Sequence, residues 1–242
     1  MNLFCNRKIV LDTETTGINV SGIPYIGHKI IEIGAVEILN RKLTGINFHV
    51  YLQPNRKIDK SAFLIHGITD NFLLDKPKFI NIAHKFFNFI KGSELIIHNA
   101  SFDVGFIDYE FNNLNMNFPK IKDICNITDT LSIARKIFPG KKNNLNALCK
   151  RYNIPINRVT HNAMLDAQIL SKVYLLMTID QNMIQFSDHL NNDNITYSDI
   201  TKTKCDLSLL KLASKSECIL HEKYLTNMKN QFGKCIWKEK IN

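Results

Sequence analysis

Three runs of alternating, β-branched residues fill the first fifty positions of this 242-residue chain, and they constrain its fold more than any other feature. These runs, residues 7–12, 29–39 and 46–52, predict three β-strands. The glycine-containing segments between them, 22–27 and 40–45, suit the turns of antiparallel hairpins. We therefore expect the chain to begin with an antiparallel sheet.

Helical and strand-like segments alternate after these hairpins. Apolar spacing predicts a helix over 79–90 that ends at Gly92, and Ser101 can cap a helix that runs to about Asn113. Residues 94–98 predict a fourth strand and 121–127 a fifth, and further helices fit 130–138, 145–152 and 162–177. The pattern predicts an α/β fold, in which a mixed five-stranded sheet is flanked by helices.

The composition changes near residue 180. Residues 187–203 are crowded with Asn, Asp, Ser and Thr, which predicts a flexible linker. Apolar residues with helical spacing return from residue 204, but some forty residues are too few for an independent core. We therefore expect a domain over 1–180, a linker region over 181–203, and a short helical tail over 204–242 that orders on a partner.

The overall composition excludes several classes of protein. With 45% hydrophobic residues the chain can bury a core, and its longest apolar run is broken by Glu32, far short of a membrane span. The net charge of +9 favours a polyanionic partner such as nucleic acid, although lysines that only keep the protein soluble would give the same sum. The six cysteines form no C-x-x-C pair, and residues 1–10 contain no signal peptide, so we expect reduced thiols and a cytoplasmic location.

Four acidic residues lie where predicted strands or helices end or begin. Asp12 and Glu14 alternate with their neighbours at the end of the first strand, so they project from one face, and Gly17 then permits close approach of a ligand. Asp103 lies in the first turn of the helix after the fourth strand. Asp166 lies just over one turn inside the helix that begins near residue 162. In isolation, each of these acids would more often be a solvated edge residue or a favourable helix-terminal charge.

Four carboxylates gathered at one point would need neutralising. Each pair would repel by roughly 4 kcal/mol at about 4 Å and an effective dielectric of 20. Oxygen ligands without a nearby cysteine select Mg²⁺ or Mn²⁺ over Zn²⁺, and two such ions would balance four charges. Two ions clamp the attacking and leaving oxygens of a phosphodiester, and His161, at the start of the same helix as Asp166, can act as general base.

At these residues the sequence resembles the DEDDh exonucleases. Asp12-Thr-Glu14 matches their first motif, His98-Asn-Ala-x-Phe102-Asp103 the second, and His161-x4-Asp166 the third. The resemblance implies an RNase H-like fold, two metal ions, and release of nucleoside monophosphates from a 3′ end. Asp12, Glu14, Asp103 and Asp166 would be the metal ligands and His161 the base.

Within that family the whole chain is similar to the epsilon proofreading subunits of bacterial DNA polymerase III. The segment 62–67, Ala-Phe-Leu-Ile-His-Gly, matches theirs, which implies that His66 contacts the terminal nucleotide. At Ser61 relatives can carry an acid that touches the nucleotide. The similarity gives a substrate-binding set that is listed together here: Asp12, Glu14, Thr15, Ser61, His66 and Asp166.

The same resemblance implies partners beyond a single-stranded or mispaired 3′ DNA end. Residues 181–186 look like a sliding-clamp (beta) motif, in which Gln181, Ile184 and Phe186 would make the contacts. Residues 212–215 and 235–238 resemble the tail that binds the polymerase alpha subunit, and a small theta subunit can join some members. Two alternatives stay open: an RNA-trimming relative, such as RNase T or an oligoribonuclease, and a non-catalytic subunit that only stabilises the polymerase.

Overall fold

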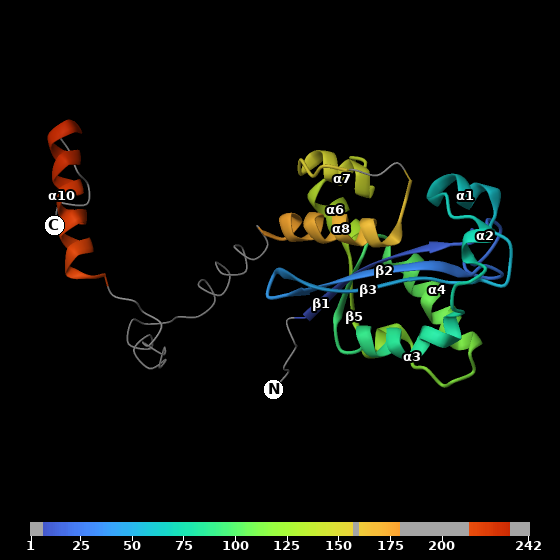
Figure 1. Ribbon diagram of the computed structural model, residues 1–242. Helices are drawn as coiled ribbons and strands as arrows, with labels where there is room; N and C mark the ends of the chain where they lie inside the picture. Colours follow the sequence, from blue (N-terminus) through green and yellow to red (C-terminus); the bar gives the residue numbers. More distant parts are fainter. Residues whose placement is uncertain (1–6, 157–159, 180–212, 233–242) are drawn as a thin grey trace, which may run out of the picture. The chain divides into compact units, whose positions relative to one another are not determined.

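The computed structural model describes residues 7–156, 160–179 and 213–232, and the chain divides into two compact units, Met1–Gln185 and Phe186–Asn242 (Figure 1). The elements of the first unit are β1 (Arg7–Thr15), β2 (Ile30–Leu39), β3 (Lys42–Tyr51), α1 (Lys60–His66), α2 (Asp70–Leu73), α3 (Phe79–Ile90), β4 (Glu94–Ile97), α4 (Ala100–Asn113), α5 (Ile121–Ile124), β5 (Asn126–Asp129), α6 (Thr130–Ile137), α7 (Leu145–Arg151) and α8 (Ala163–Met177).

The five strands form one mixed sheet in the order β3-β2-β1-β4-β5. The pairs β1–β2 and β2–β3 are antiparallel, as their hairpin connections require, whereas β1–β4 and β4–β5 are parallel. Strand β1 is therefore the central strand, with an antiparallel half of the sheet on one side and a parallel half on the other. The α/β fold with a five-stranded mixed sheet is confirmed.

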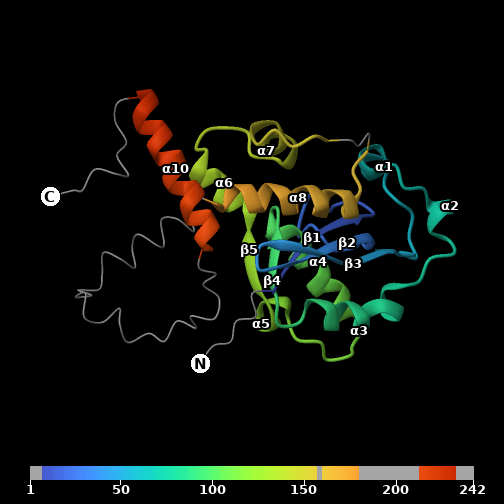
Figure 2. The ribbon, with the colours of Figure 1, turned by 60° about the vertical axis from the view of Figure 1, so that its left-hand side comes forward.

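Helices cover both faces of the sheet, with α8 on one face and α3 and α4 on the other (Figure 2). Alternation along β1 sends Ile9 and Leu11 into the core beneath α3 and α4, and Val10 into the core beneath α8. All three side chains are fully buried. The same alternation assigns even-numbered residues further along β1 to the α8 face.

Helix α8 packs directly on β1 and β2 because Gly34 leaves room for it. A Cβ atom at Gly34 would lie 2.3 Å from the backbone of Ala163 and of Met164, at the first turn of α8. Gly34 is also the antiparallel partner of Asp12. The missing side chain on β2 therefore lets the start of α8 come close to the acidic end of β1.

Two predicted elements after β4 are wrong in detail. Ile121–Ile124 is a single helical turn, α5, whose first N–H is bonded by the Asp108 carboxylate at 2.8 Å, so the strand β5 begins only at Asn126. Ser101 does not cap α4. The cap is Asn99, in the left-handed conformation at φ 69°, and Asp129 accepts a hydrogen bond from its N–H at 3.0 Å. Both helix starts are thus fixed by carboxylates distant in sequence, which local patterns do not reveal.

The second hairpin is tighter than predicted, and two short helices were missed. Asn40 and Arg41 form the turn, with φ values of 50° and 63°, so β3 begins at Lys42 and includes Gly45. The pairing of β2 with β3 shifts register between Val36 and Ile38, which is typical of a β-bulge. The missed helices, α1 and α2, follow β3 and have seven and four residues.

The second unit is described only through α10 (Lys215–Phe232). Ser214 and Glu217 form a capping box at its start, because each side chain accepts a hydrogen bond from the other's backbone N–H. Ile219, Leu220 and Tyr224 are more than 60% exposed on this helix. The predicted clamp motif, the linker and residues 235–238 lie outside the described residues. No described helix has the length and apolarity needed to cross a lipid bilayer.

Candidate active site

The acidic end of β1 is approached by a helix on each face of the sheet. Asp12 and Glu14 lie on the α8 face by alternation, and Thr13 between them lies on the α4 face. Asp103 in the first turn of α4 reaches Thr13, whereas Asp166 in the first turn of α8 lies beside Glu14. The four predicted acids therefore converge on one strand end from three separate elements.

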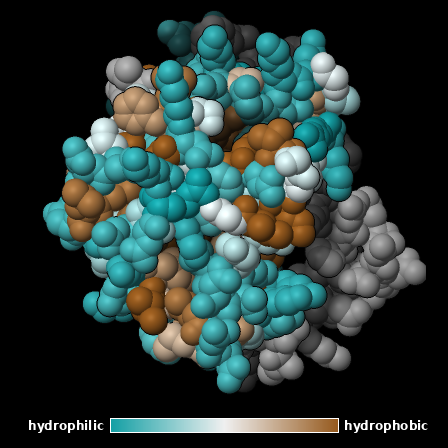
Figure 3. All heavy atoms as spheres, turned by 90° about the vertical axis from the view of Figure 1, so that its right-hand side faces the viewer, coloured by the Kyte–Doolittle hydropathy of each residue, from teal (hydrophilic) through white to brown (hydrophobic). Residues whose placement is uncertain are grey.

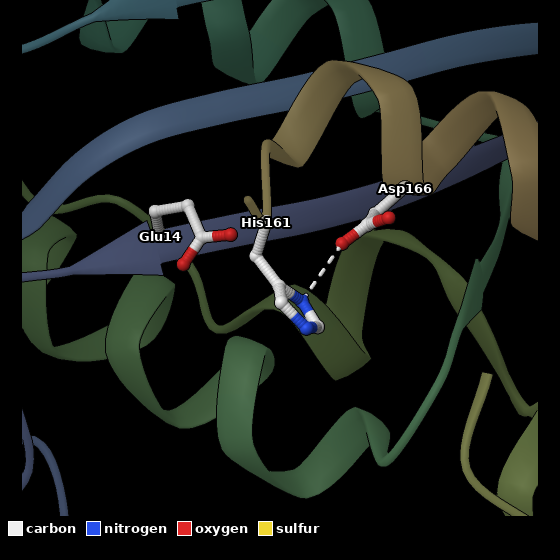
Figure 4. A group of neighbouring side chains, drawn as sticks. All are labelled: Glu14, His161 and Asp166. Atoms are coloured by element: carbon white, nitrogen blue, oxygen red, sulfur yellow. Dashed lines mark hydrogen bonds and ion pairs between the residues drawn. The ribbon is translucent and has the colours of Figure 1, made fainter. Parts of the chain in front are cut away.

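Glu14, His161 and Asp166 form the most compact group of ligating side chains on this face. One ligand atom from each lies within 4.8 Å of the other two, and Figure 4 shows the Glu14 carboxylate facing the imidazole. The sequence predicted His161 as a base next to the metal ligands. In the structure its ring stands among the carboxylates themselves, because Asn162 and Ala163 hold the start of α8 against the sheet.

The imidazole of His161 is oriented by Asp166. The two side chains meet at 3.1 Å, between Nδ1 of His161 and Oδ2 of Asp166 (Figure 4). A carboxylate can only accept, so Nδ1 carries the proton and Nε2 is the basic nitrogen of the neutral ring. The side chain of His161 is 46% exposed, whereas that of Asp166 is 4% exposed. The basic nitrogen thus sits on a ring that solvent and substrate can reach.

Asp103 is buried and accepts two hydrogen bonds from one residue. Its Oδ1 lies 3.1 Å from the backbone nitrogen of Thr13 and 2.8 Å from the Thr13 hydroxyl. Burial raises the pKa of Asp103 to about 7, although the Thr13 hydrogen bonds oppose this shift. The buried carboxyl therefore keeps its proton to a much higher pH than an exposed aspartic acid does.

A cavity of about 230 Å³ opens beside these acids. It brings together three of the predicted substrate-binding residues that come from distant segments, namely Thr15, Ser61 and His66, next to Glu14. Phe102, from α4, supplies an aromatic wall on which a nucleobase could stack. The missed helix α1 contributes Ser61 and His66, and its Ile65 carbonyl accepts a hydrogen bond from the His161 N–H at 3.1 Å.

His66 lies in the wall of this cavity, next to Thr15. Its Nδ1 accepts a hydrogen bond from the Ile68 N–H at 3.0 Å, so the proton of the neutral ring is on Nε2, which is buried. Burial lowers the pKa of His66, and a weaker hydrogen bond with the Thr15 backbone opposes this shift.

Large apolar side chains are exposed near this part of the chain, and two of them, Ile18 and Ile65, line the cavity. The others belong to the loop after β1, to α1 and to the segment 72–74: Val20, Phe63, Leu64, Phe72 and Leu74. The side of the molecule on which α1 and α2 lie carries several apolar patches among hydrophilic side chains (Figure 3).

The donor set fits hard divalent cations. Glu14 and Asp166 offer carboxylate oxygens in one group with His161, Asp103 bonds to the neighbouring Thr13, and no described cysteine belongs to this group. Burial makes the ionised form of Asp103 costly, which is the main cause of its raised pKa. A bound cation would offset that cost, so the residues present suit the metal ions that DEDDh exonucleases typically need.

Glu32 is a residue of this region that the sequence reasoning missed. It is fully buried in β2, opposite Glu14, and it accepts hydrogen bonds from the start of α8. Its signal in the sequence is a lone charge within the apolar run 30–36, which argues against a membrane segment and gives no sign of a role at the site.

Comparisons with known proteins agree with this site. The RNase T family profile, described as an exonuclease, matches residues 9–174, which include all five DEDDh residues. The chain is 54% identical to the DNA polymerase III subunit epsilon of Buchnera aphidicola subsp. Baizongia pistaciae, over 97% of both chains. It is 49% identical to that of Escherichia coli K12, over 98% of this chain and 100% of the relative.

A solved structure shows the same fold. The nuclease domain of 3′hExo, a DEDDh family member bound to rAMP, superposes with a TM-score of 0.61 at 14% identity, over 74% of this chain and 95% of that domain. A strand end flanked by acids from both faces of such a sheet defines a DEDDh exonuclease. Within that class, the chain belongs to the family of DNA polymerase III epsilon subunits. The family predicted from the three motifs is confirmed.

Proposed function

We propose that this 3′–5′ exonuclease removes mispaired 3′-terminal nucleotides from DNA as dNMPs, by hydrolysis that depends on two Mg²⁺ or Mn²⁺ ions. The convergence of Glu14, His161 and Asp166 with Asp103 at the end of β1 carries the proposal. Bound there, the two ions would activate the attacking water and stabilise charge on the leaving oxygen. Asp12, Glu14, Asp103 and Asp166 would hold them.

The chain's own residues supply the rest of the chemistry. Nε2 of His161 takes a proton from the attacking water, and Asp166 stabilises the resulting imidazolium through Nδ1. His66 donates its Nε2–H to the terminal nucleotide, whose base stacks on Phe102. Glu14, Thr15 and Ser61 line the same cavity and complete the contacts to that nucleotide.

A mispaired 3′ end should be the preferred substrate because the cavity accepts an unpaired nucleotide. The cavity is lined by residues of β1, α1 and α4 that can contact a single unstacked nucleotide from several sides. Unpairing a mispaired 3′ terminus costs less free energy than unpairing a matched one, so the enzyme would discriminate between the two ends through this difference.

Digestion of a 3′-mispaired DNA primer, compared with an RNA oligomer of the same sequence, tests the proposal. We expect dNMP release that needs Mg²⁺ or Mn²⁺, stops with excess EDTA, and is lost in Asp12→Ala but not in Asp75→Ala, an exposed acid paired with Lys76. Faster digestion of the RNA would favour the RNA-trimming alternative. Absence of hydrolysis with either substrate would favour the non-catalytic one.

The second unit is proposed to bind the polymerase. The relatives that match over nearly their whole length are named as subunits of DNA polymerase III, and α10 exposes Ile219, Leu220 and Tyr224. We infer that residues 204–242 contact the alpha subunit and that Gln181, Ile184 and Phe186 contact the beta clamp. Residues 181–203 would then connect the exonuclease domain, 1–180, to the tail. A theta subunit is a further candidate partner.

Deletion of residues 187–242 tests whether the first unit carries the exonuclease activity and the second unit binds the polymerase. We expect the shortened chain to keep its exonuclease activity, because all the site residues lie in the first unit, and to lose co-elution with the polymerase alpha subunit. Retained co-elution would place the polymerase contact elsewhere.

A further inference from the structure

Glu32 is a buried glutamate in β2, next to the central strand β1. Its side chain is fully buried, and Ile31 and Ile33 on either side of it are fully buried as well. Burial of a carboxylate is costly unless donors compensate it. Because Glu32 pairs with Glu14 across β1 and β2, its side chain lies on the face that α8 covers.

The donors that compensate Glu32 are at the start of α8. Asn162 donates its side-chain amide to Oε1 at 2.8 Å, and the N–H of Ala163 donates to Oε2 at 3.2 Å. On the outer side, Nε2 of His49 meets Oε1 at 2.8 Å. The hydroxyl of Tyr51 also accepts from the Asn162 amide at 3.0 Å, and burial, followed by the charge of Glu32, raises the pKa of Tyr51.

These contacts fix the residue that begins the catalytic helix. Asn162 caps α8 through its own oxygen, which accepts from the Leu165 N–H at 3.0 Å. The same side chain is thus bonded to the sheet by its nitrogen and to the helix by its oxygen. His161 immediately precedes this cap, and Asp166 follows within the first turn of the helix.

We propose that Glu32 is a positioning residue, which sets the first turn of α8, and with it His161 and Asp166, against the acidic end of β1. This inference rests on the proposed function and assigns a role to a side chain that touches neither substrate nor the reacting atoms. Outer-shell partners of this kind typically contribute 10–100-fold to metal affinity or activity.

The other two buried glutamates of the described residues show that this arrangement is particular to Glu32. Glu37, five residues along β2, is paired with Arg7 and accepts from Thr44. Glu110 in α4 is paired with Lys29. Each of them is balanced by a cationic side chain away from α8, whereas Glu32 is bonded to the helix start itself. Glu37→Gln is therefore a matched control, since it removes a buried charge from the same strand without touching α8.

Three measurements on Glu32→Ala, Glu32→Gln and Glu37→Gln in the full-length chain test the proposal. They are amide hydrogen exchange at residues 163–166 in the metal-free protein, Mn²⁺ binding by calorimetry, and kcat and KM for a single-stranded DNA. For Glu32→Ala we expect faster exchange at these amides, roughly 10–100-fold weaker Mn²⁺ binding and a lower kcat with little change in KM. Glu37→Gln should lower thermal stability and leave all three readouts at wild-type values.

Glu32→Gln gives a second, milder variant in case the alanine protein does not fold. The glutamine carbonyl can still accept two of the three hydrogen bonds, but its NH2 group then opposes the remaining donor. We expect intermediate exchange rates and intermediate Mn²⁺ affinity.

Wild-type exchange at 163–166 and wild-type Mn²⁺ affinity in both Glu32 variants would overturn the proposal and leave Glu32 with a purely stabilising role. Absence of metal-dependent hydrolysis in the wild-type protein would instead overturn the proposed function. The exchange measurement needs neither metal nor substrate, so it decides the role of Glu32 in either case.

Discussion

Replacing Asp103 by asparagine should stabilise the metal-free protein at neutral and alkaline pH while abolishing catalysis. The raised pKa of about 7, against an ordinary value of 3.8, means that the folded state holds a proton that the unfolded state has released. At about 1.36 kcal/mol per pKa unit, ionising this buried carboxyl costs up to about 4 kcal/mol of folding stability. An amide oxygen at the same position can still accept both hydrogen bonds from Thr13.

The pH dependence gives the sign of the effect. Below pH 4 Asp103 is protonated in both states and contributes nothing to the difference. Between about pH 4 and pH 7 the unfolded chain ionises first, so this carboxyl makes the wild-type protein less stable as the pH rises. The loss is complete above pH 7. Asp103→Asn removes this part of the pH dependence, and its advantage over the wild type should grow from zero near pH 4 to its maximum near pH 8.

Urea unfolding of the two proteins in EDTA, from pH 4 to pH 8.5, measures this advantage. Glu110→Gln is the matched comparison: Glu110 is equally buried on the same helix, and burial raises its pKa too, but its ion pair with Lys29 at 3.0 Å opposes that shift. The variant loses this ion pair, so Glu110→Gln should gain less stability than Asp103→Asn. Addition of Mn²⁺ should then stabilise the wild type much more than Asp103→Asn. If Asp103→Asn were no more stable than the wild type at pH 8 in EDTA, the burial argument for this carboxyl would be refuted.

Three further results are expected. Gly34→Ala should lower kcat by about 10²-fold or more, because its Cβ would lie 2.3 Å from the backbone of Ala163 and displace the start of α8. Gly22→Ala is the control and should be neutral, since its Cβ would meet only the side chain of Asn19. Equal activity of both variants would contradict the close packing at Gly34. His161→Ala should lower kcat by about 10²–10⁴-fold, and an unchanged pH–rate profile in this variant would exclude His161 as the base. In the wild-type protein, each tenfold rise in Mn²⁺ concentration should shift the acidic limb of the pH–rate profile to lower pH by up to about one unit, since protons and cations compete for Asp103. An acidic limb that does not depend on the Mn²⁺ concentration would contradict that competition.

Sequence patterns predicted the acids of the site because local geometry determines where they point. Alternation along β1 places Asp12 and Glu14 on one face whatever the rest of the chain does, and a first-turn position fixes Asp103 and Asp166 at helix starts. The antiparallel half of the sheet could be predicted for the same reason, since hairpin turns and the spacing of apolar residues are local features. The assembly of the four acids into one site required the family resemblance.

The failures share a different cause. α5 was predicted as a strand because Ile121 and Ile124 are β-branched, yet the Asp108 carboxylate, 13 residues earlier, bonds its first N–H. The sequence pattern predicts Ser101 as the cap of α4, whereas the cap is Asn99, whose N–H is bonded by Asp129, 30 residues later. α1 and α2 are too short for a periodic signal. The starts of α5 and α4 are thus decided by long-range contacts, for which local propensity is no guide, whereas α1 and α2 give no signal because they are short.

The wide spacing of the site along the chain has a consequence for its biosynthesis. The hydrogen bonds that close the site join residues 90 positions apart, Thr13 and Asp103, and 131 positions apart, Glu32 and Ala163. A nascent polypeptide therefore carries its first two acids long before the last helix of the unit leaves the ribosome. Contacts of such long range form late in folding, so we expect nuclease activity to appear only after synthesis of this unit has ended.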